Sequence, residues 1–175
     1  MTYHVPAAHR QPKTVAPSII VSATKEWLGA PYVHQASAKG TGCDCLGLVR
    51  GVWRDIYKTE PEIPPPYTPD WNERAWGSGH RDEPLLNAAK RNLVAVSDRE
   101  PGRIIIFRIM RDGPAKHCGI LISRKKFIHA YAGRAVIESW LNRWWQTRIV
   151  GVFGFPALVP VVTDNQGPAA LNEER

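Results

Sequence analysis

The chain has 175 residues and carries 23 Lys and Arg against 16 Asp and Glu, a formal net charge of +7. Its 43% hydrophobic content excludes a disordered chain, and the length suits one domain with a full core. No apolar run approaches the ~20 residues that a membrane-spanning helix needs. The first 14 residues lack the apolar stretch of a secretory signal, so we expect synthesis in the cytoplasm and no membrane insertion.

The basic charge has two interpretations, a solvated surface or an anionic polymer as partner. No nucleic-acid-binding motif is present, so we expect no direct nucleic-acid partner and favour cell wall over nucleic acid. Three cysteines is an odd number, and Cys43 and Cys45 are too close in sequence for an ordinary bridge. We therefore expect no disulfide framework.

In chain order, residues 1–16 are expected to form an extended arm. Pro17 begins a predicted helix that Gly29 ends, and a loop of small residues follows over 30–42. Apolar residues at three- and four-residue spacing predict a core helix over 45–57. Residues 61–71 are rich in proline and predict polyproline II and turns, serving either as a cover packed on the domain or as a docking strip for a partner.

A further helix is predicted from Pro84 to Leu93, and the pattern then changes to a two-residue period. The predicted strands are 104–110, 116–123, 127–131, 135–139 and 148–155. Helices followed by antiparallel strands predict an α+β domain over 17–156, with the helices on one side of a sheet. Residues 157–175 are expected to form a loose tail.

The chemistry centres on Cys45, which follows Asp44 at the start of the predicted 45–57 helix. The unpaired N–H groups of a helix start favour an ionised thiol, and the thiolate is the nucleophile. Read alone, Cys45 is equally a small buried hydrophobe. Asp44 is most simply an N-cap, and it could also anchor a substrate amine.

Two histidines lie on neighbouring predicted strands, His117 and His129. A turn centred on Ser123 places them directly opposite each other and on one face. His117 then serves as general base for Cys45, and His129 orients and polarises the His117 ring. The alternative for each histidine is a packed core residue.

Other polar residues have weaker assignments. Cys118 alternates away from His117 and is expected in the core, and Cys43 has no firm role. Tyr32 follows a turn that could aim its hydroxyl at the cleft, the alternative being a packed tyrosine. A structural zinc site competes, but the Cys-x-Cys spacing is a poor chelate for it. Four further histidines lie in loop-like sequence and are expected to be exposed: His4, His9, His34 and His80.

Four blocks in this order resemble the signature of the NlpC (p-sixty) cysteine peptidases, over roughly residues 17–156. They are Gly29-Ala30-Pro31-Tyr32, Asp44-Cys45-Leu46-Gly47-Leu48-Val49, His117-Cys118-Gly119-Ile120 and Phe127-Ile128-His129-Ala130. Within that family, the stretch around Cys45 and the proline-rich loop are similar to the peptidases of phage tails and gene transfer agents.

The resemblance implies a papain-like fold and hydrolysis of peptide-stem amides in peptidoglycan, typically from D-γ-glutamate to diaminopimelate. It implies Cys45 as nucleophile, His117 as base, His129 as third polar residue, Tyr32 near the oxyanion and Asp44 near the stem's free amine, with no cofactor. One departure is Leu46, where wall-recycling members commonly have serine; a polar contact near the substrate is therefore missing.

The expected function is thus a cysteine endopeptidase carried on a phage-like tail, which opens the wall during DNA delivery. Its expected partners are the peptidoglycan stem peptide and tail hub or fibre proteins, and its site of action is the periplasm or cell wall of the target cell. The alternative is a structural tail-tip protein that keeps the fold, docks on hub or fibre proteins and has little activity.

Overall fold

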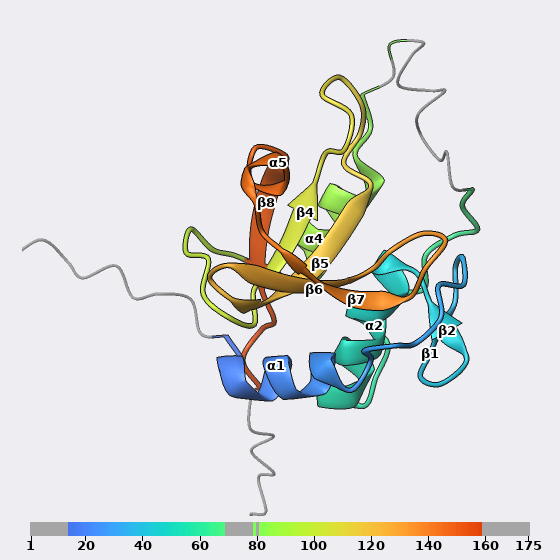
Figure 1. The fold of residues 1–175 in the computed structure, drawn as a ribbon, viewed down its shortest axis with the longest axis vertical. Coiled ribbons are helices and arrows are strands. Elements are labelled where there is room, and N and C mark those ends of the chain that lie inside the picture. Colours follow the sequence, from blue (N-terminus) through green and yellow to red (C-terminus); the bar gives the residue numbers. More distant parts are fainter. Residues whose placement is uncertain (1–13, 69–78, 80, 159–175) are drawn as a thin grey trace, which may run out of the picture.

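The computed structural model describes residues 14–68, 79 and 81–158 (Figure 1). Most of the predicted tail and most of the predicted arm lie outside these residues. The helices are α1 (Pro17–Lys25), α2 (Cys45–Tyr57), α4 (Pro84–Asn92) and α5 (Arg143–Gln146). The strands are β1 (Ser37–Ala38), β2 (Gly42–Cys43), β3 (Val94–Ala95), β4 (Ile104–Phe107), β5 (His117–Ser123), β6 (Lys126–Ala130), β7 (Val136–Trp140) and β8 (Ile149–Gly154).

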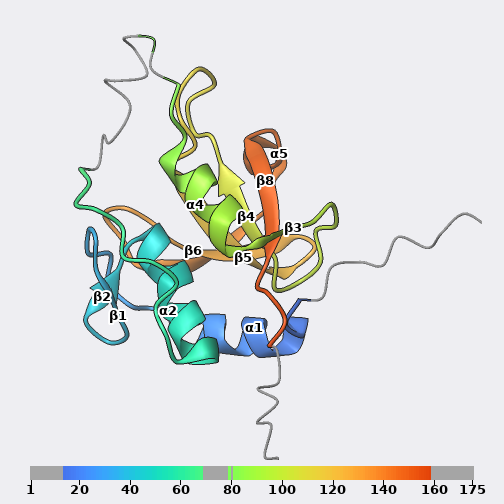
Figure 2. The same ribbon diagram turned by 180° about the vertical axis from the view of Figure 1, so that it is seen from behind.

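Six strands form one antiparallel sheet in the order β3-β8-β4-β5-β6-β7. Helices α1, α2 and α4 share a core with one face of the sheet, as the front and back views show (Figures 1 and 2). The short helix α5 contributes Trp145 to a second, smaller core on the opposite face. The α+β fold predicted from the sequence is confirmed, with α5 as an unpredicted element on the second face.

Helix α2 is packed unusually closely because two of its residues are glycines. A Cβ on Gly47 would lie 1.9 Å from the Ala36 carbonyl oxygen, and a Cβ on Gly51 would lie 2.1 Å from the Trp27 ring. Both distances are far below van der Waals contact, so only glycine fits. The start of α2 is therefore fixed against the loop before it.

The β5–β6 register corrects the predicted histidine pairing. Ile120 lies opposite Ile128, which places Gly119 opposite His129. The turn consists of Arg124 and Lys125 alone, with Ser123 paired to Lys126 and an irregularity beside that pair. The prediction that His117 lies directly opposite His129 was wrong by two residues. Because the side-chain period of a strand is two, both rings still lie on one face.

Strand β4 ends at Phe107 rather than at the predicted Met110, beside a register shift against β8. The two-residue strands β1, β2 and β3 were not predicted. The two ends of the described chain pair with each other: the Val15 N–H donates to the Phe155 carbonyl at 3.0 Å. In the described part of the chain, no helix is long and apolar enough to cross a membrane.

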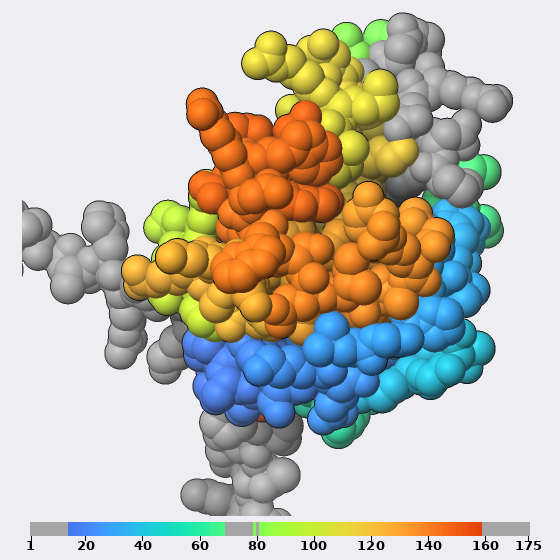
Figure 3. Space-filling model, in the orientation of Figure 1, coloured from blue at the N-terminus to red at the C-terminus, as the bar shows by residue number. Residues whose placement is uncertain are grey.

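The loop after α1 is attached to the sheet edge. Gly29 N–H donates to the Val136 carbonyl at 2.9 Å, and Val136 N–H donates to the Ala30 carbonyl at 2.8 Å. The space-filling view shows the α1 segment (blue) directly against the β6–β7 region (orange) (Figure 3). This attachment fixes the chain that carries Tyr32 beside the start of α2.

Candidate active site

Cys45 is the first residue of α2 and is half-buried. The pKa of its thiol lies well below the ordinary value, because hydrogen bonds from Cys118 and His117 and the charge of His117 outweigh the opposing effect of burial. The Lys116 carbonyl is 3.9 Å from the Cys45 sulfur. The structure therefore places a thiol that ionises more readily than an ordinary cysteine beside an imidazole from the other half of the chain.

A chain of hydrogen bonds extends from His117 into the sheet. His117 Nε2 lies 2.8 Å from His129 Nδ1, and His129 Nε2 lies 2.9 Å from the Ser139 hydroxyl. With Nε2 directed at His129, Nδ1 is the His117 nitrogen left for Cys45. Burial, followed by the charge of His117, lowers the pKa of His129 to about 3. His129 is therefore neutral near pH 7 and can accept the Nε2–H of His117 at Nδ1 while donating its own Nε2–H to Ser139.

Ser139 was not identified from the sequence, although alternation along its strand could have indicated it. Ser139 pairs with Phe127 across β6–β7, which places its side chain on the face that also carries His129. No motif surrounds it, and serines on strands are common. Only the register shows that its hydroxyl reaches the histidine.

Aromatic rings enclose the two histidines. The Trp145 ring lies 5.5 Å from the His117 ring and 5.3 Å from the His129 ring, centroid to centroid. Phe107 stacks on His117 at 5.9 Å, and Phe127 lies 4.6 Å from His129. These contacts fix the ring planes and bury His129 completely, while His117 stays partly exposed.

Tyr32 lies close enough to Cys45 and Asp44 to respond to their charges. Burial, then Cys45 and Asp44, raise the pKa of its hydroxyl above the ordinary value. The backbone of Tyr32 forms a bridge with Cys43, which positions the ring beside the helix start. Tyr32 therefore stays protonated and available as a donor near the nucleophile, and its role at the oxyanion stays a prediction.

Asp44 caps α2, as predicted: its carboxylate accepts the Gly47 N–H at 2.7 Å. It also accepts the Gln35 N–H at 2.8 Å and the Tyr67 hydroxyl. The residue is only 2% exposed, and burial and the charge of Cys45 raise its pKa against these hydrogen bonds. The protein's own donors thus surround the carboxylate, and its role toward a substrate amine stays a prediction.

Tyr67 is a further site residue that the sequence did not reveal. It lies near the end of the described part of the proline-rich segment (residues 61–68), and its carbonyl accepts from His34 Nε2 at 2.8 Å and from Gln35 Nε2 at 2.5 Å. The prediction that His34 is solvent-exposed was wrong: it is half-buried, with Nδ1 3.8 Å from the Asp44 carboxylate. The proline-rich segment is therefore fastened beside the nucleophile.

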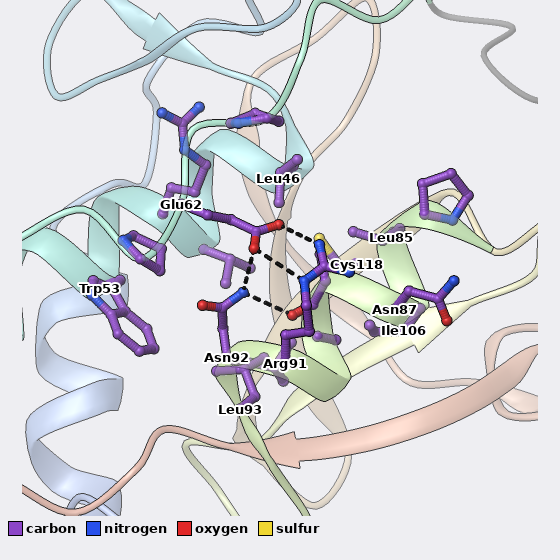
Figure 4. Close-up of a pocket in the computed structure, with 18 of the residues that line it drawn as sticks. Leu46, Trp53, Glu62, Leu85, Asn87, Arg91, Asn92, Leu93, Ile106 and Cys118 are labelled. Atoms are coloured by element: carbon purple, nitrogen blue, oxygen red, sulfur yellow. Dashed lines mark hydrogen bonds and ion pairs between the residues drawn. The ribbon is translucent and has the colours of Figure 1, made fainter. Parts of the chain in front are cut away.

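An apolar cavity of about 300 Å³ lies between α2, the proline-rich segment and α4 (Figure 4). Leu46 from α2 and Cys118 from β5 line the part that borders the nucleophile. Glu62, hydrogen-bonded to Arg91 and Asn92, links the proline-rich segment to α4 at the cavity (Figure 4). The apolar Leu46 that departs from the common serine is thus part of this cavity wall.

The other two cysteines differ in their relation to Cys45. Cys43 is fully buried, and burial raises its pKa to about 12. Cys118 is in the core, as predicted, at 2% exposed, but its thiol also lies 3.2 Å from the Cys45 carbonyl oxygen. Among the described residues no group of three or more His, Cys, Asp or Glu is arranged to hold a metal ion.

A half-buried cysteine of lowered pKa at a helix start, with two histidines and a serine from a facing sheet, is an arrangement suited to a nucleophilic cysteine with a histidine base. The NlpC/P60 family model matches residues 29–154, and the chain belongs to this family.

Named relatives agree with this membership. The chain is 25% identical over 151 residues to a gamma-DL-glutamyl hydrolase of Bacillus subtilis and 27% identical over 146 residues to the murein DD-endopeptidase MepH of Escherichia coli. These alignments cover 83% and 82% of this chain but only 32% and 48% of the relatives. The chain thus spans a third to a half of the length of these two proteins.

Solved structures share the fold. One is a lipoprotein-like NLP/P60 protein of Staphylococcus aureus, with a TM-score of 0.60, 18% identity and coverage of 86% of this chain and 46% of that one. Another is the NlpC/p60 domain of the peptidoglycan hydrolase SagA, with a TM-score of 0.55, 19% identity and coverage of 81% and 100%.

Proposed function

We propose that this protein is a cysteine peptidase that hydrolyses peptide-stem amide bonds of peptidoglycan. The observation that carries the proposal is the continuous chain from Cys45 through His117 and His129 to Ser139. Family membership and the names of the relatives, which include a murein endopeptidase and a peptidoglycan hydrolase, support the substrate class.

In the proposed reaction the Cys45 thiolate attacks the amide carbonyl. Protonated His117 donates its Nδ1 proton to the leaving amine, and the acyl-enzyme forms. N–H groups at the start of α2 and the Tyr32 hydroxyl are the donors that we assign to the developing oxyanion. Water then attacks the thioester with neutral His117 as base, which releases the acid and restores the thiolate.

The decisive test is release of soluble fragments from purified peptidoglycan. We expect Cys45→Ala to abolish release while circular dichroism shows an intact fold. Cys43→Ala is the matched control, because Cys43 is also next to Asp44 but is fully buried, and it should release fragments at a rate close to that of the parent protein. Unchanged release by Cys45→Ala would refute the assignment.

The bond is proposed to be the amide from D-γ-glutamate to diaminopimelate. The name of the Bacillus relative supports a γ-glutamyl bond, whereas the name of the Escherichia relative indicates a DD bond. Mass spectrometry of products from two defined stem peptides, one offering only the γ-glutamyl amide and the other only a DD cross-link, distinguishes these. Cleavage of the DD peptide alone would overturn this choice of bond but not the enzyme class.

We further propose that the protein acts on a phage-like tail, with hub or fibre proteins as neighbours, and opens the wall of a target cell. The sequence similarity of the region around Cys45 and of the proline-rich loop to tail peptidases supports this. Purified particles should contain the protein by mass spectrometry, and particles without it should adsorb normally but deliver less DNA. Equal delivery by particles that carry Cys45→Ala would instead support the structural tail-tip alternative.

The docking-strip alternative for the proline-rich segment receives little support from its contacts. Glu62 and Tyr67 attach it to α4 and to the start of α2, so residues 61–68 form a wall of the site. We therefore assign that segment to the peptidase and not to a partner surface.

A further inference from the structure

Asp44 precedes Cys45, and its carboxylate is the group that could anchor a substrate amine. Its Oδ1 accepts the Gly47 N–H at 2.7 Å, while Oδ2 accepts the Gln35 N–H at 2.8 Å and the Tyr67 hydroxyl. The Asp44 side chain is only 3% exposed. Donors of the protein itself thus fill three of the roughly four acceptor positions of this carboxylate. For a substrate ammonium group to bind there, one of these donors has to leave.

Tyr67 differs from the other two donors to Asp44. Gly47 and Gln35 donate through backbone N–H groups, whereas Tyr67 donates through a side chain that comes from the proline-rich segment. Burial, followed by the hydrogen bond to Asp44, raises the pKa of the Tyr67 hydroxyl, so this hydroxyl keeps its proton and remains a donor. Leu46, on the first turn of α2, lines the apolar cavity and offers an amine no acceptor in place of Asp44.

The segment that carries Tyr67 is held by contacts other than the hydrogen bond to Asp44. The Tyr67 carbonyl accepts from His34 Nε2 at 2.8 Å, and the two rings meet edge to face with their centroids 5.1 Å apart. Toward the start of the segment, Glu62 accepts from Arg91 on α4 at 2.8 Å (Figure 4). A substrate amine that approaches Asp44 would therefore have to displace a segment that is fastened at both ends.

We propose that Tyr67 is a specificity-determining residue: its hydroxyl takes the position at Asp44 that a substrate amine would need, and the enzyme acts on stems whose amino terminus is blocked. In an intact wall this terminus is joined to the glycan through an amide, whereas a released stem peptide carries a free amine. The inference rests on the proposed function, and it narrows the substrate class to stems that are still attached to glycan.

The first experiment tests whether an amine reaches Asp44, and it requires no catalysis. A carbodiimide with glycine ethyl ester converts accessible carboxyl groups into amides, which peptide mass spectrometry locates. In the parent protein the Glu26 carboxyl group, whose side chain is 62% exposed, should be modified and Asp44 should not. Tyr67→Ala and Tyr67→Ser, which remove the ring and the phenol hydroxyl, should both make Asp44 reactive.

The second experiment measures kcat/KM for two stem tripeptides that contain the γ-glutamyl amide and differ only in the amino terminus, which is free in one and acetylated in the other. The parent protein should cleave the acetylated peptide at least as well as the free one. In Tyr67→Ala the ratio of kcat/KM, free to acetylated, should rise by about tenfold, which is the contribution of one charge-assisted hydrogen bond. Glu62→Ala is the matched control, because it loosens the same segment but keeps the Tyr67 hydroxyl, and it should not change this ratio.

A parent protein that favours the free peptide by about tenfold or more would overturn the proposal. Modification of Asp44 in the parent protein as fast as that of Glu26 would also overturn it, and so would Tyr67→Ala and Tyr67→Ser variants that change neither measurement. Thermal melts establish that each variant is folded, and the parent values are decisive even where a variant is not. If neither tripeptide is cleaved, the proposed γ-glutamyl bond is wrong, whereas the modification experiment still decides whether Tyr67 closes Asp44 to amines.

Discussion

Cys45, the proposed nucleophile, lies between two regions that are built differently. On the sheet side, regular strands β5, β6 and β7 bring His117, His129 and Ser139 together through backbone register. On the other side, irregular chain is held by side-chain hydrogen bonds, with Tyr67 joined to Asp44 and to the loop at His34. The comparison teaches that the base is placed by secondary structure, whereas the wall beside the nucleophile is placed by individual polar contacts.

The largest expected effect is a loss of activity, and it distinguishes residues on the sheet side from residues on the irregular side. His117→Ala removes the proposed base and the group that lowers the pKa of Cys45, and fragment release should fall by about 10³-fold or more. His34→Ala, the matched substitution on the irregular side, should reduce release by less than about tenfold, because His34 contacts Tyr67 and the Asp44 carboxylate rather than Cys45. Equal losses of fragment release in both variants, measured on the same peptidoglycan, would contradict the different roles assigned to the two sides.

The next effect is on stability against pH, and it belongs to the sheet side. The folded chain keeps the pKa of His129 at about 3, against 6.5 ordinarily, so the unfolded chain binds the extra proton as pH falls below 6.5. The unfolding free energy should therefore decrease from about pH 6.5 down to about pH 3, by up to about 1.4 kcal/mol per pH unit for this group.

His129→Gln provides the test, because glutamine does not titrate. Urea unfolding at a series of pH values should give a flatter curve for this variant than for the parent protein. Parallel curves would show that His129 does not carry the acid sensitivity.

On the irregular side, Tyr67→Phe removes the hydroxyl that Asp44 accepts while keeping the ring against His34. We expect a loss of about 1–2 kcal/mol in unfolding free energy, because a buried carboxylate loses one of its donors. Urea unfolding measures it. Tyr57→Phe is a suitable control, since the Tyr57 hydroxyl donates to the Pro156 carbonyl, far from Asp44. If the loss of stability in Tyr67→Phe comes from Asp44, only Tyr67→Phe should also raise the pKa of Asp44, measured by NMR titration of the carboxyl groups.

The smallest effect concerns the chain just before the proline-rich segment. Glu60 is half-buried, which raises its pKa, but hydrogen bonds from Arg54 and Arg50 lower it to a net value below 4.5. A carboxyl group whose pKa is lower in the folded chain than in the unfolded chain stabilises the folded state at pH values above its unfolded pKa. This contribution of Glu60 is therefore lost as the pH falls below about 4.5. Glu60→Gln should cost under about 1 kcal/mol at pH 7 and nothing near pH 3, by thermal unfolding. A pH-independent cost would indicate packing instead.

The features of the sheet side and of the helix start were mostly predicted from the sequence, whereas those of the irregular side were mostly missed. Cys45 at the start of a helix, Asp44 as its cap and the histidines on one strand face were predictable, because capping and two-residue alternation are local rules. The direct pairing of His117 with His129 was wrong because the hairpin is centred on Arg124, one residue later than assumed, which places Gly119 opposite His129. The role of Tyr67 and the burial of His34 were missed, because the local sequence of a proline-rich loop does not determine which part of the domain the loop packs against.

The amino-acid sequence by itself determined the α+β class, the helix that begins at the nucleophile and the face on which both histidines lie, since these depend on periodicity and end effects within single elements. Only the tertiary structure decided that Ser139 completes the histidine chain, that Tyr67 covers Asp44 and that Cys118 touches Cys45. Each of these contacts joins residues far apart in the chain, and its existence depends on how strands register and helices pack, which no local pattern encodes.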